Sequence, residues 1–246
     1  MEPQRRRDLL VADFGVKPYA EMLELQRAAA KARISGALDQ DLLILVEHPP
    51  VVTLGRSSKD ANLLANPEQL KARGVEIFEV ERGGDVTFHG PGQLVGYPIV
   101  DLKRHKQDLH WYLRQVEETL IRALGTFDIA GKRVEKYTGV WVGNRKIASI
   151  GVHARDWVTW HGFALNVSTE LSYFDLIVPC GIPEVVMTSV ERELLERDAT
   201  CLAPPPDLAD RVRDAVTASA AEVFGLSTAR VPTERIESIL ASASSA

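Results

Sequence analysis

The stretch from Arg82 to Gln93 constrains the fold of this chain more than any other. Four of its twelve residues are glycine, and a run of strand-like residues flanks it on each side. Glycine adopts positive φ without steric cost and lets a ligand or another segment approach the backbone closely. The stretch therefore predicts either a tight turn between strands or a loop that lines a binding site, with His89 as a candidate functional side chain.

Hydrophobic periodicity predicts strands and helices in irregular alternation. The strand-like runs cover residues 9–14, 41–47, 51–54, 75–81, 94–102, 140–142, 146–153, 156–161 and 163–167. The helical patterns cover residues 18–34, a short segment after Asn66, 108–124, 191–197, 207–224 and 233–240. Because the connections are mostly of the hairpin type, we expect an α+β fold, with helices packed on a mixed, mainly antiparallel sheet.

Composition excludes several classes of function. The net charge is −5, which gives no overall basic field for nucleic acid. No run approaches the roughly 20 apolar residues of a membrane span, and the N-terminus lacks an apolar signal segment. With only two cysteines there is no disulfide framework, and no residue cluster has the spacing of a zinc site. We therefore expect a cytoplasmic (or organelle-matrix) protein without a metal.

Two side chains stand out as candidates for chemistry. Cys180 lies between Pro179 and Gly181, which indicates a loop, and a partly exposed thiol near a cation is a useful nucleophile. The alternative is a buried, inert cysteine. Cys201 has no comparable setting, and we interpret it as structural or incidental. Strand alternation puts Lys146 on one face with Ala148, Ile150 and Val152. Such a lysine either reaches solvent at the strand end or is desolvated beside a partner.

The histidines leave the partner of Cys180 undecided. A Cys–His pair would be the usual thiol chemistry, and His89, His153 and His161 all lie near predicted strands or turns. Their spacing selects none of the three.

Four segments, taken together and in order, resemble the lipoyl(octanoyl) transferase family. They cover most of the chain from Leu9 to Glu193 and are Glu47–Arg56, Arg82–Pro98, Tyr137–Val142 with Lys146–His153, and His161–Val167 with Pro179–Ile182. The resemblance implies a fold like that of the biotin and lipoate protein ligases, and a catalytic domain over residues 1–200. Residues 201–246 are expected to form a helical tail packed on that domain.

The resemblance also implies a reaction and its participants. An octanoyl group would pass from octanoyl-acyl carrier protein to a lysine of lipoyl domains, in 2-oxoacid dehydrogenase complexes and the glycine cleavage H protein, without a cofactor. Cys180 matches the nucleophile that carries the acyl thioester, and Lys146 matches the lysine that lowers the pKa of that thiol. The segments that match the acyl pocket consist of Arg82, Gly83, Gly84, Asp85, Val86, Thr87, Phe88, His89, Ser149, Ile150, Gly151, Gly162, Phe163 and Ala164.

Three other functions are compatible with parts of this pattern. An ATP-dependent lipoate or biotin ligase on the same fold would need no cysteine, an acyl-binding module would form no acyl-enzyme, and a Cys–His hydrolase would release free octanoate.

Donors for a tetrahedral oxyanion are expected among the backbone amides near Gly151 or Cys180–Gly181. Acyl carrier proteins and lipoyl domains are usually acidic, so we expect a basic patch near the mouth of the pocket to bind them. The candidates for this patch are Arg56, Lys59, Arg82 and Arg145.

Overall fold

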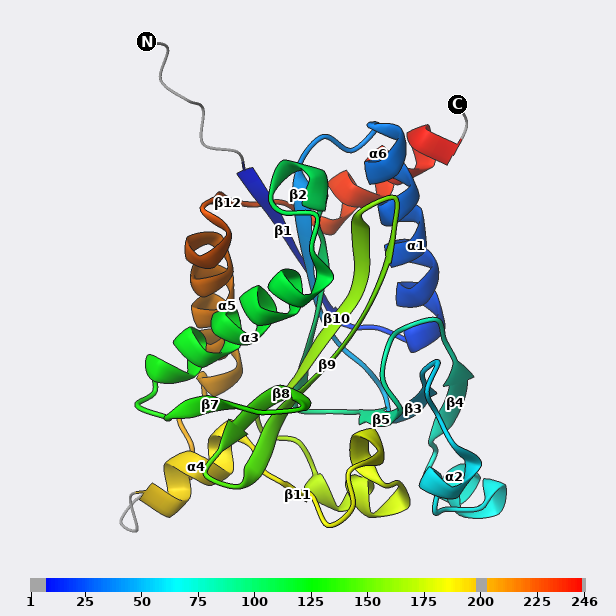
Figure 1. Ribbon diagram of the computed structural model, residues 1–246, viewed down its shortest axis with the longest axis vertical. Coiled ribbons are helices and arrows are strands. Elements are labelled where there is room, and N and C mark those ends of the chain that lie inside the picture. The colour runs from blue at the N-terminus through cyan, green and yellow to red at the C-terminus, as the bar shows by residue number, and fades with distance from the viewer. Residues whose placement is uncertain (1–7, 198–202, 245–246) are drawn as a thin grey trace.

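A nine-stranded mixed sheet forms the centre of the computed structural model, which describes residues 8–197 and 203–244 (Figure 1). The strand order is β12-β1-β2-β6-β10-β9-β8-β7, with β11 paired to β9 beside this path. The strands are β1 (Asp8–Val16), β2 (Asp41–Glu47), β6 (Gln93–Ile99), β7 (Gly131–Val134), β8 (Tyr137–Val142), β9 (Arg145–Arg155), β10 (Val158–Asn166), β11 (Val186–Met187) and β12 (Ser227–Arg230). Strands β12, β1 and β2 are parallel, whereas the pairings from β2 onward to β7 are antiparallel. The predicted α+β class is confirmed.

A second, three-stranded sheet lies beside the first and holds the glycine-rich stretch. It has the order β4 (Glu76–Glu79), β3 (Val51–Leu54), β5 (Val86–His89), and α2 (Pro67–Ala72) lies next to it. Asn66 caps α2 with a capping box, as the sequence predicts. The stretch from Arg82 to Gln93 is therefore not one loop, because its middle four residues form β5.

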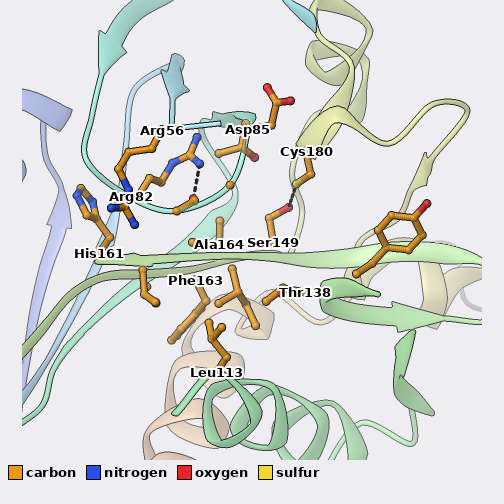
Figure 2. A pocket seen from close by; sticks show the side chains of 18 of the residues that line it. Arg56, Arg82, Asp85, Leu113, Thr138, Ser149, His161, Phe163, Ala164 and Cys180 are labelled. Atoms are coloured by element: carbon orange, nitrogen blue, oxygen red, sulfur yellow. Dashed lines mark hydrogen bonds between the residues drawn. The ribbon is translucent and has the colours of Figure 1, made fainter. Parts of the chain in front are cut away.

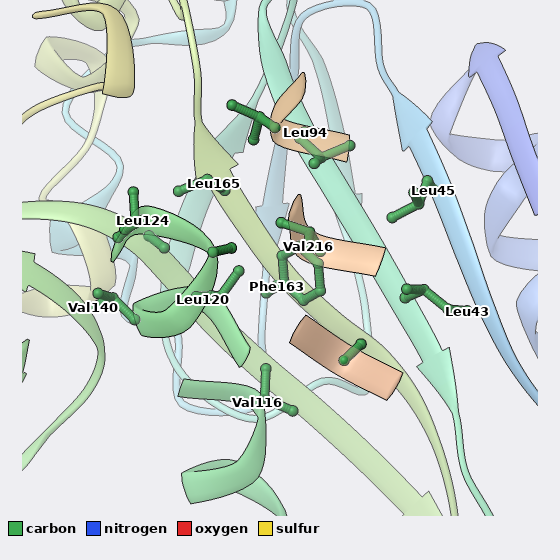
Figure 3. Close-up of a cluster of buried hydrophobic side chains, with 14 of the residues drawn as sticks. Leu43, Leu45, Leu94, Val116, Leu120, Leu124, Val140, Phe163, Leu165 and Val216 are labelled. Atoms are coloured by element: carbon green, nitrogen blue, oxygen red, sulfur yellow. The ribbon is translucent and has the colours of Figure 1, made fainter. Parts of the chain in front are cut away.

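Helices cover both faces of the large sheet. On one face, α1 (Tyr19–Ser35) and α6 (Thr233–Ser244) share an apolar cluster that includes Met22, Ile44 and Ile236. On the other, α3 (Leu109–Gly125) and α5 (Leu208–Phe224) pack on Leu43, Phe163 and their neighbours (Figure 3). The remaining helix, α4 (Val190–Arg197), follows β11. No helix in the described residues is long and apolar enough to span a membrane.

The structure departs from the predicted elements at three short strands and at Gly162. Strands β7, β11 and β12 were not predicted, and the expected break at Gly162 is absent from β10, which continues from Val158 to Asn166. Strand β10 is held between β6 and β9 through this region. A Cβ at Gly162 would lie 2.1 Å from the carbonyl oxygen of Gly96, so this glycine permits close strand packing instead of a turn.

Candidate active site

A β-bulge in β9 places Lys146 at the candidate site. Val140 pairs with Ala148 but Trp141 pairs with Lys146, so β9 contains one extra residue, Ile147, opposite β8. The bulge reverses the side of the sheet to which the side chains before Ile147 point. Lys146 therefore shares the side of Ser149, and the prediction that it lies with Ala148, Ile150 and Val152 is wrong.

Cys180 sits on a strained turn, Pro179–Gly181. Its φ is 56° and its ψ is 20°, a left-handed conformation that costs a residue with a Cβ roughly 1–2 kcal/mol. The amide of Gly181 donates to the carbonyl of Val178 at 2.9 Å, and the Asn62 carbonyl accepts from the Val178 amide at 2.7 Å. A Cβ at Gly181 would lie 2.5 Å from Asp85 Oδ2, so glycine allows the turn to pack on the glycine-rich stretch.

These two segments bring three functional groups together. The ammonium nitrogen of Lys146 donates to Cys180 Sγ at 3.1 Å, and Ser149 Oγ lies 3.6 Å from the same sulfur (Figure 2). Burial acts to raise the pKa of Cys180, but the charge of Lys146, the hydrogen bonds from Ser149 and Lys146, and the charge of Arg82 hold this pKa below its ordinary value. The side chain of Cys180 is partly exposed. This combination favours an accessible thiolate.

Lys146 is completely buried, at 0% exposure, so it does not reach solvent at the strand end. Its ammonium lies 5.5 Å from the centre of the Trp141 ring, a cation–π distance. Gly139 packs against its stem, because a Cβ there would lie 2.8 Å from Lys146 Cε. The carboxylate of buried Glu117 accepts from the Gly139 amide at 3.2 Å and holds this backbone in place.

A cavity of about 460 Å³ adjoins the Cys180 thiol. Twelve of the fourteen residues expected to form the acyl pocket line it, as do Cys180 and Lys146. The other two, Val86 and Phe88, instead pack in an apolar cluster with Val52 and Phe174. The reason is the alternation of β5, which turns Thr87 and His89 toward the cavity and their neighbours away from it.

The histidine at the centre of the glycine-rich stretch is uncharged. His89 Nδ1 lies 2.9 Å from the side-chain oxygen Oε1 of Gln93. The side-chain nitrogen Nε2 of Gln93 donates to the Phe88 carbonyl and to Asn166 Oδ1, so Oε1 is the acceptor and His89 Nδ1 carries the proton. Burial and the nearby His48 lower the pKa of His89 to about 3. His89 is therefore neutral near pH 7, stacks on Tyr19, and presents an aromatic ring instead of a charge to the cavity.

A second hydrogen-bonded pair lies beside it. His48 Nδ1 donates to the Lys17 carbonyl at 2.8 Å, and burial lowers the pKa of His48 to about 4. Its other ring nitrogen therefore accepts from the hydroxyl of Tyr97 at 2.8 Å. The ring of His48 and the hydroxyl of Tyr97 thus satisfy one another at this end of the cavity.

Of the other two histidines considered as partners of Cys180, His161 lines the cavity and His153 does not. His161 lies 3.6 Å from Glu81, and its pKa is lowered by burial. His161, Arg27 and Trp160 together hold the pKa of the Glu81 carboxyl far below its ordinary value. The cysteine thus has a lysine beside it, and the Cys–His alternative is not supported by the contacts of Cys180.

The four candidates for a basic patch do not converge. Arg56 is exposed at the rim of the cavity, and Lys59 is exposed a few residues further along. Arg82 is buried and donates to the backbone and hydroxyl oxygens of Thr53. Arg145 pairs with Glu193 and Glu196 outside the cavity. Cys201 lies outside the described residues, and so its predicted structural role stays a prediction.

Several residues that line the cavity come from distant elements and were not predicted from the sequence. They include Tyr19, Val95, Tyr97, Leu113, Thr138 and Ile182. Tyr97, Thr138 and Ile182 lie within the quoted family segments, which could have drawn attention to them. Tyr19 and Leu113 lie in amphipathic helices, where nothing local distinguishes them from core residues. Within the described residues, no group of three or more His, Cys, Asp or Glu side chains could hold a metal ion.

Known proteins resemble this chain in sequence over most of its length. Residues 18–203 match the family described as the lipoyl protein ligase A/B catalytic domain, and the chain belongs to this family. Within the family it groups with octanoyltransferases, and it is an acyltransferase. It is 56% identical to the octanoyltransferase of Rubrobacter xylanophilus, over 73% of this chain and 81% of that protein. It is 45% identical to the octanoyltransferase of a Nostoc strain, over 88% of this chain and 92% of that protein.

Solved structures support the same fold at low sequence identity. A bipartite lipoate protein ligase from Thermoplasma acidophilum has a TM-score of 0.71 at 16% identity, covering 96% of this chain and 91% of that one. A lipoate-protein ligase A solved with bound ATP has a TM-score of 0.67 at 16% identity, over 96% and 93% of the two chains. The predicted ligase-like fold is confirmed.

Proposed function

We propose that this enzyme transfers an octanoyl group from octanoyl-acyl carrier protein to a lysine of a lipoyl domain, through a thioester on Cys180, as a step of lipoate biosynthesis. The observation that carries the proposal is the 3.1 Å contact between the buried Lys146 ammonium and the Cys180 sulfur at the wall of the cavity. The octanoyltransferase relatives support the acyl group. The lipoyl domain in the Thermoplasma lipoylation system supports the kind of acceptor.

In the first step, the Cys180 thiolate attacks the carbonyl carbon of the donor thioester. A new carbon–sulfur bond forms, and the bond to the carrier's sulfur breaks. The Lys146 ammonium supplies the proton that the departing thiolate takes up. A thioester is exchanged for a thioester, so no external energy source is needed.

In the second step, the acceptor lysine amine attacks the acyl-enzyme. An amide forms, the Cys180 thiolate leaves, and neutral Lys146 accepts the proton that the amine loses. The Gly181 amide already donates to the Val178 carbonyl. The oxyanion in each step is therefore stabilised by other backbone amides near Cys180 and Gly151. Burial of the octanoyl chain contributes about 0.8 kcal/mol per CH₂ group to binding.

Intact-protein mass spectrometry with octanoyl-acyl carrier protein tests the proposal. We expect the wild-type enzyme to gain the mass of one octanoyl group, and neutral hydroxylamine to remove it, as it does from thioesters. Cys180→Ala should gain no such mass, whereas the matched control Cys201→Ala should behave like the wild type. An adduct on Cys180→Ala, or transfer at the wild-type rate by that variant, would show that the thioester assignment is wrong.

The two competing reactions give different products. An ATP-dependent ligase would release pyrophosphate when given octanoate and ATP, and we expect none. A hydrolase would release free octanoate from the acyl-enzyme in the presence of a lipoyl domain, whereas we expect octanoyl-lysine.

A further inference from the structure

The cavity continues past the Cys180 site to the opposite side of β9 and β10. In Figure 2, Cys180, Ser149 and Arg82 lie on one side of these strands, and Phe163 and Leu113 lie on the other, toward α3. We call the part toward α3 the helix-side branch. It is lined by Leu109, His110 and Leu113 of α3, by Lys136 in the turn between β7 and β8, and by Tyr137 and Thr138 at the start of β8.

A gap along one edge of β9 accounts for this continuity. Strand β8 pairs with β9 only as far as Ala148, and the amide of Gly83 donates to the carbonyl of Val152 on the same edge at 2.8 Å. Peptide groups two residues apart in a strand point the same way, so the amide and carbonyl of Ile150 point to this edge between the two contacts. Ile150 lines the cavity. In this gap the amide of Ile150 is a hydrogen-bond donor and its carbonyl is an acceptor, and both can pair with an amide group of a ligand.

The helix-side branch combines apolar surface with positive charge and opens to solvent. Leu109 is 39% exposed and Tyr137 is 42% exposed, although both are large apolar side chains. Lys136 and His110 are exposed beside them. Within the described residues, the nearby Arg114 and Arg133 are each paired with Glu117, whereas no carboxylate lies within ion-pair distance of Lys136.

We propose that the helix-side branch binds the phosphopantetheine arm of the acyl donor. The amides of the arm would pair with the β9 edge at Ile150, its dimethyl group would contact Leu109 and Tyr137, and its phosphate would meet Lys136. The thioester then reaches Cys180 through the gap, and the acyl chain lies in the other part of the cavity, among Arg82–His89. This inference rests on the proposed function, because it requires a phosphopantetheine thioester as donor.

Two small donors that differ by one phosphate test the inference. The rate of Cys180 acylation is measured by mass spectrometry with octanoyl-4′-phosphopantetheine and with octanoyl-pantetheine. We expect the wild type to react roughly two- to fivefold faster with the phosphorylated donor, the size of one exposed charge pair. Lys136→Glu should lose this preference. The matched control Lys132→Glu, an exposed lysine of β7 outside the cavity, should retain the preference.

The possible outcomes separate this inference from the proposed function. If Lys136→Glu keeps the wild-type preference, the arm does not pass Lys136 and the inference is wrong. If Arg56→Glu abolishes the preference instead, the donor enters at the opposite rim, which also overturns it. If the wild type is acylated by neither donor nor by octanoyl-acyl carrier protein, the proposed function itself fails.

Discussion

Single residues decide the charge state of the candidate nucleophile. Burial disfavours a thiolate at Cys180, and the opposing contributions come from Lys146, Ser149 and Arg82. Lys146 contributes both a hydrogen bond and a charge, and its burial leaves that charge little screened by solvent. The neutral state of His89 removes the other titratable candidate from this role near pH 7.

We therefore expect Lys146→Met to shift the pH profile of Cys180 alkylation. Without the ammonium the pKa of the thiol rises, so the midpoint of the rate of reaction with iodoacetamide moves to higher pH. The control Lys132→Met, which removes an exposed lysine, should leave the midpoint where it is. An unchanged midpoint in Lys146→Met would show that this lysine does not set the charge of the thiol.

At the scale of elements, one buried carboxylate joins three parts of the fold. Asp41 at the start of β2 accepts from Arg33 of α1 at 3.1 Å, from the Asp101 amide at 3.0 Å, and lies 2.7 Å from His105 Nε2. Burial acts to raise the pKa of Asp41, but the hydrogen bonds from His105 and Asp101 and the charges of His105 and Arg33 hold it below its ordinary value. The network fixes α1 and the segment before α3 against the sheet.

Removing Arg33 leaves the buried Asp41 carboxylate without its guanidinium partner, and only His105 and the Asp101 amide remain to compensate its charge. We expect Arg33→Ala to lower the free energy of unfolding by about 3–5 kcal/mol, measured by urea denaturation. Because the folded pKa of Asp41 is depressed, its stabilisation is present above the unfolded value near 4 and is lost as the pH falls through the folded value. Arg192→Ala, which breaks an exposed pair with Glu196, should have a much smaller effect. Equal effects of the two substitutions would contradict the role of burial.

For the whole molecule, the C-terminal segment completes both faces of the large sheet. Leu208 and Val216 of α5 belong to the cluster with α3, and Ile236 and Leu240 of α6 belong to the cluster with α1. Strand β12 pairs with β1, so the segment also contributes a strand that the helical pattern did not predict. We propose that this segment and the catalytic part unfold as one cooperative unit.

We expect Ile236→Ala to destabilise the entire protein by about 2–5 kcal/mol, because it leaves a cavity where 1% of the side chain is exposed. The transition in urea should stay single, with the same midpoint by tryptophan fluorescence and by circular dichroism. The control Leu64→Ala removes a side chain that is 58% exposed and should change stability little. A separate early transition for α6 would contradict the single unit.

Features that depend only on neighbouring residues can be predicted from the amino-acid sequence. The caps at Asn66 and Asp108 and the left-handed end of α1 at Gly36 follow from local backbone preferences. Pro179 and Gly181 likewise indicate a turn at Cys180. The order of the family segments also indicated Cys180 and Lys146 as a pair. The directions in which Lys146, Val86 and Phe88 point, and the position of β12 in the sheet, are set by the folded chain as a whole. These directions and positions depend on strand register and on partners distant in the chain. One extra residue in β9 is enough to move the side chains before it to the other face of the sheet.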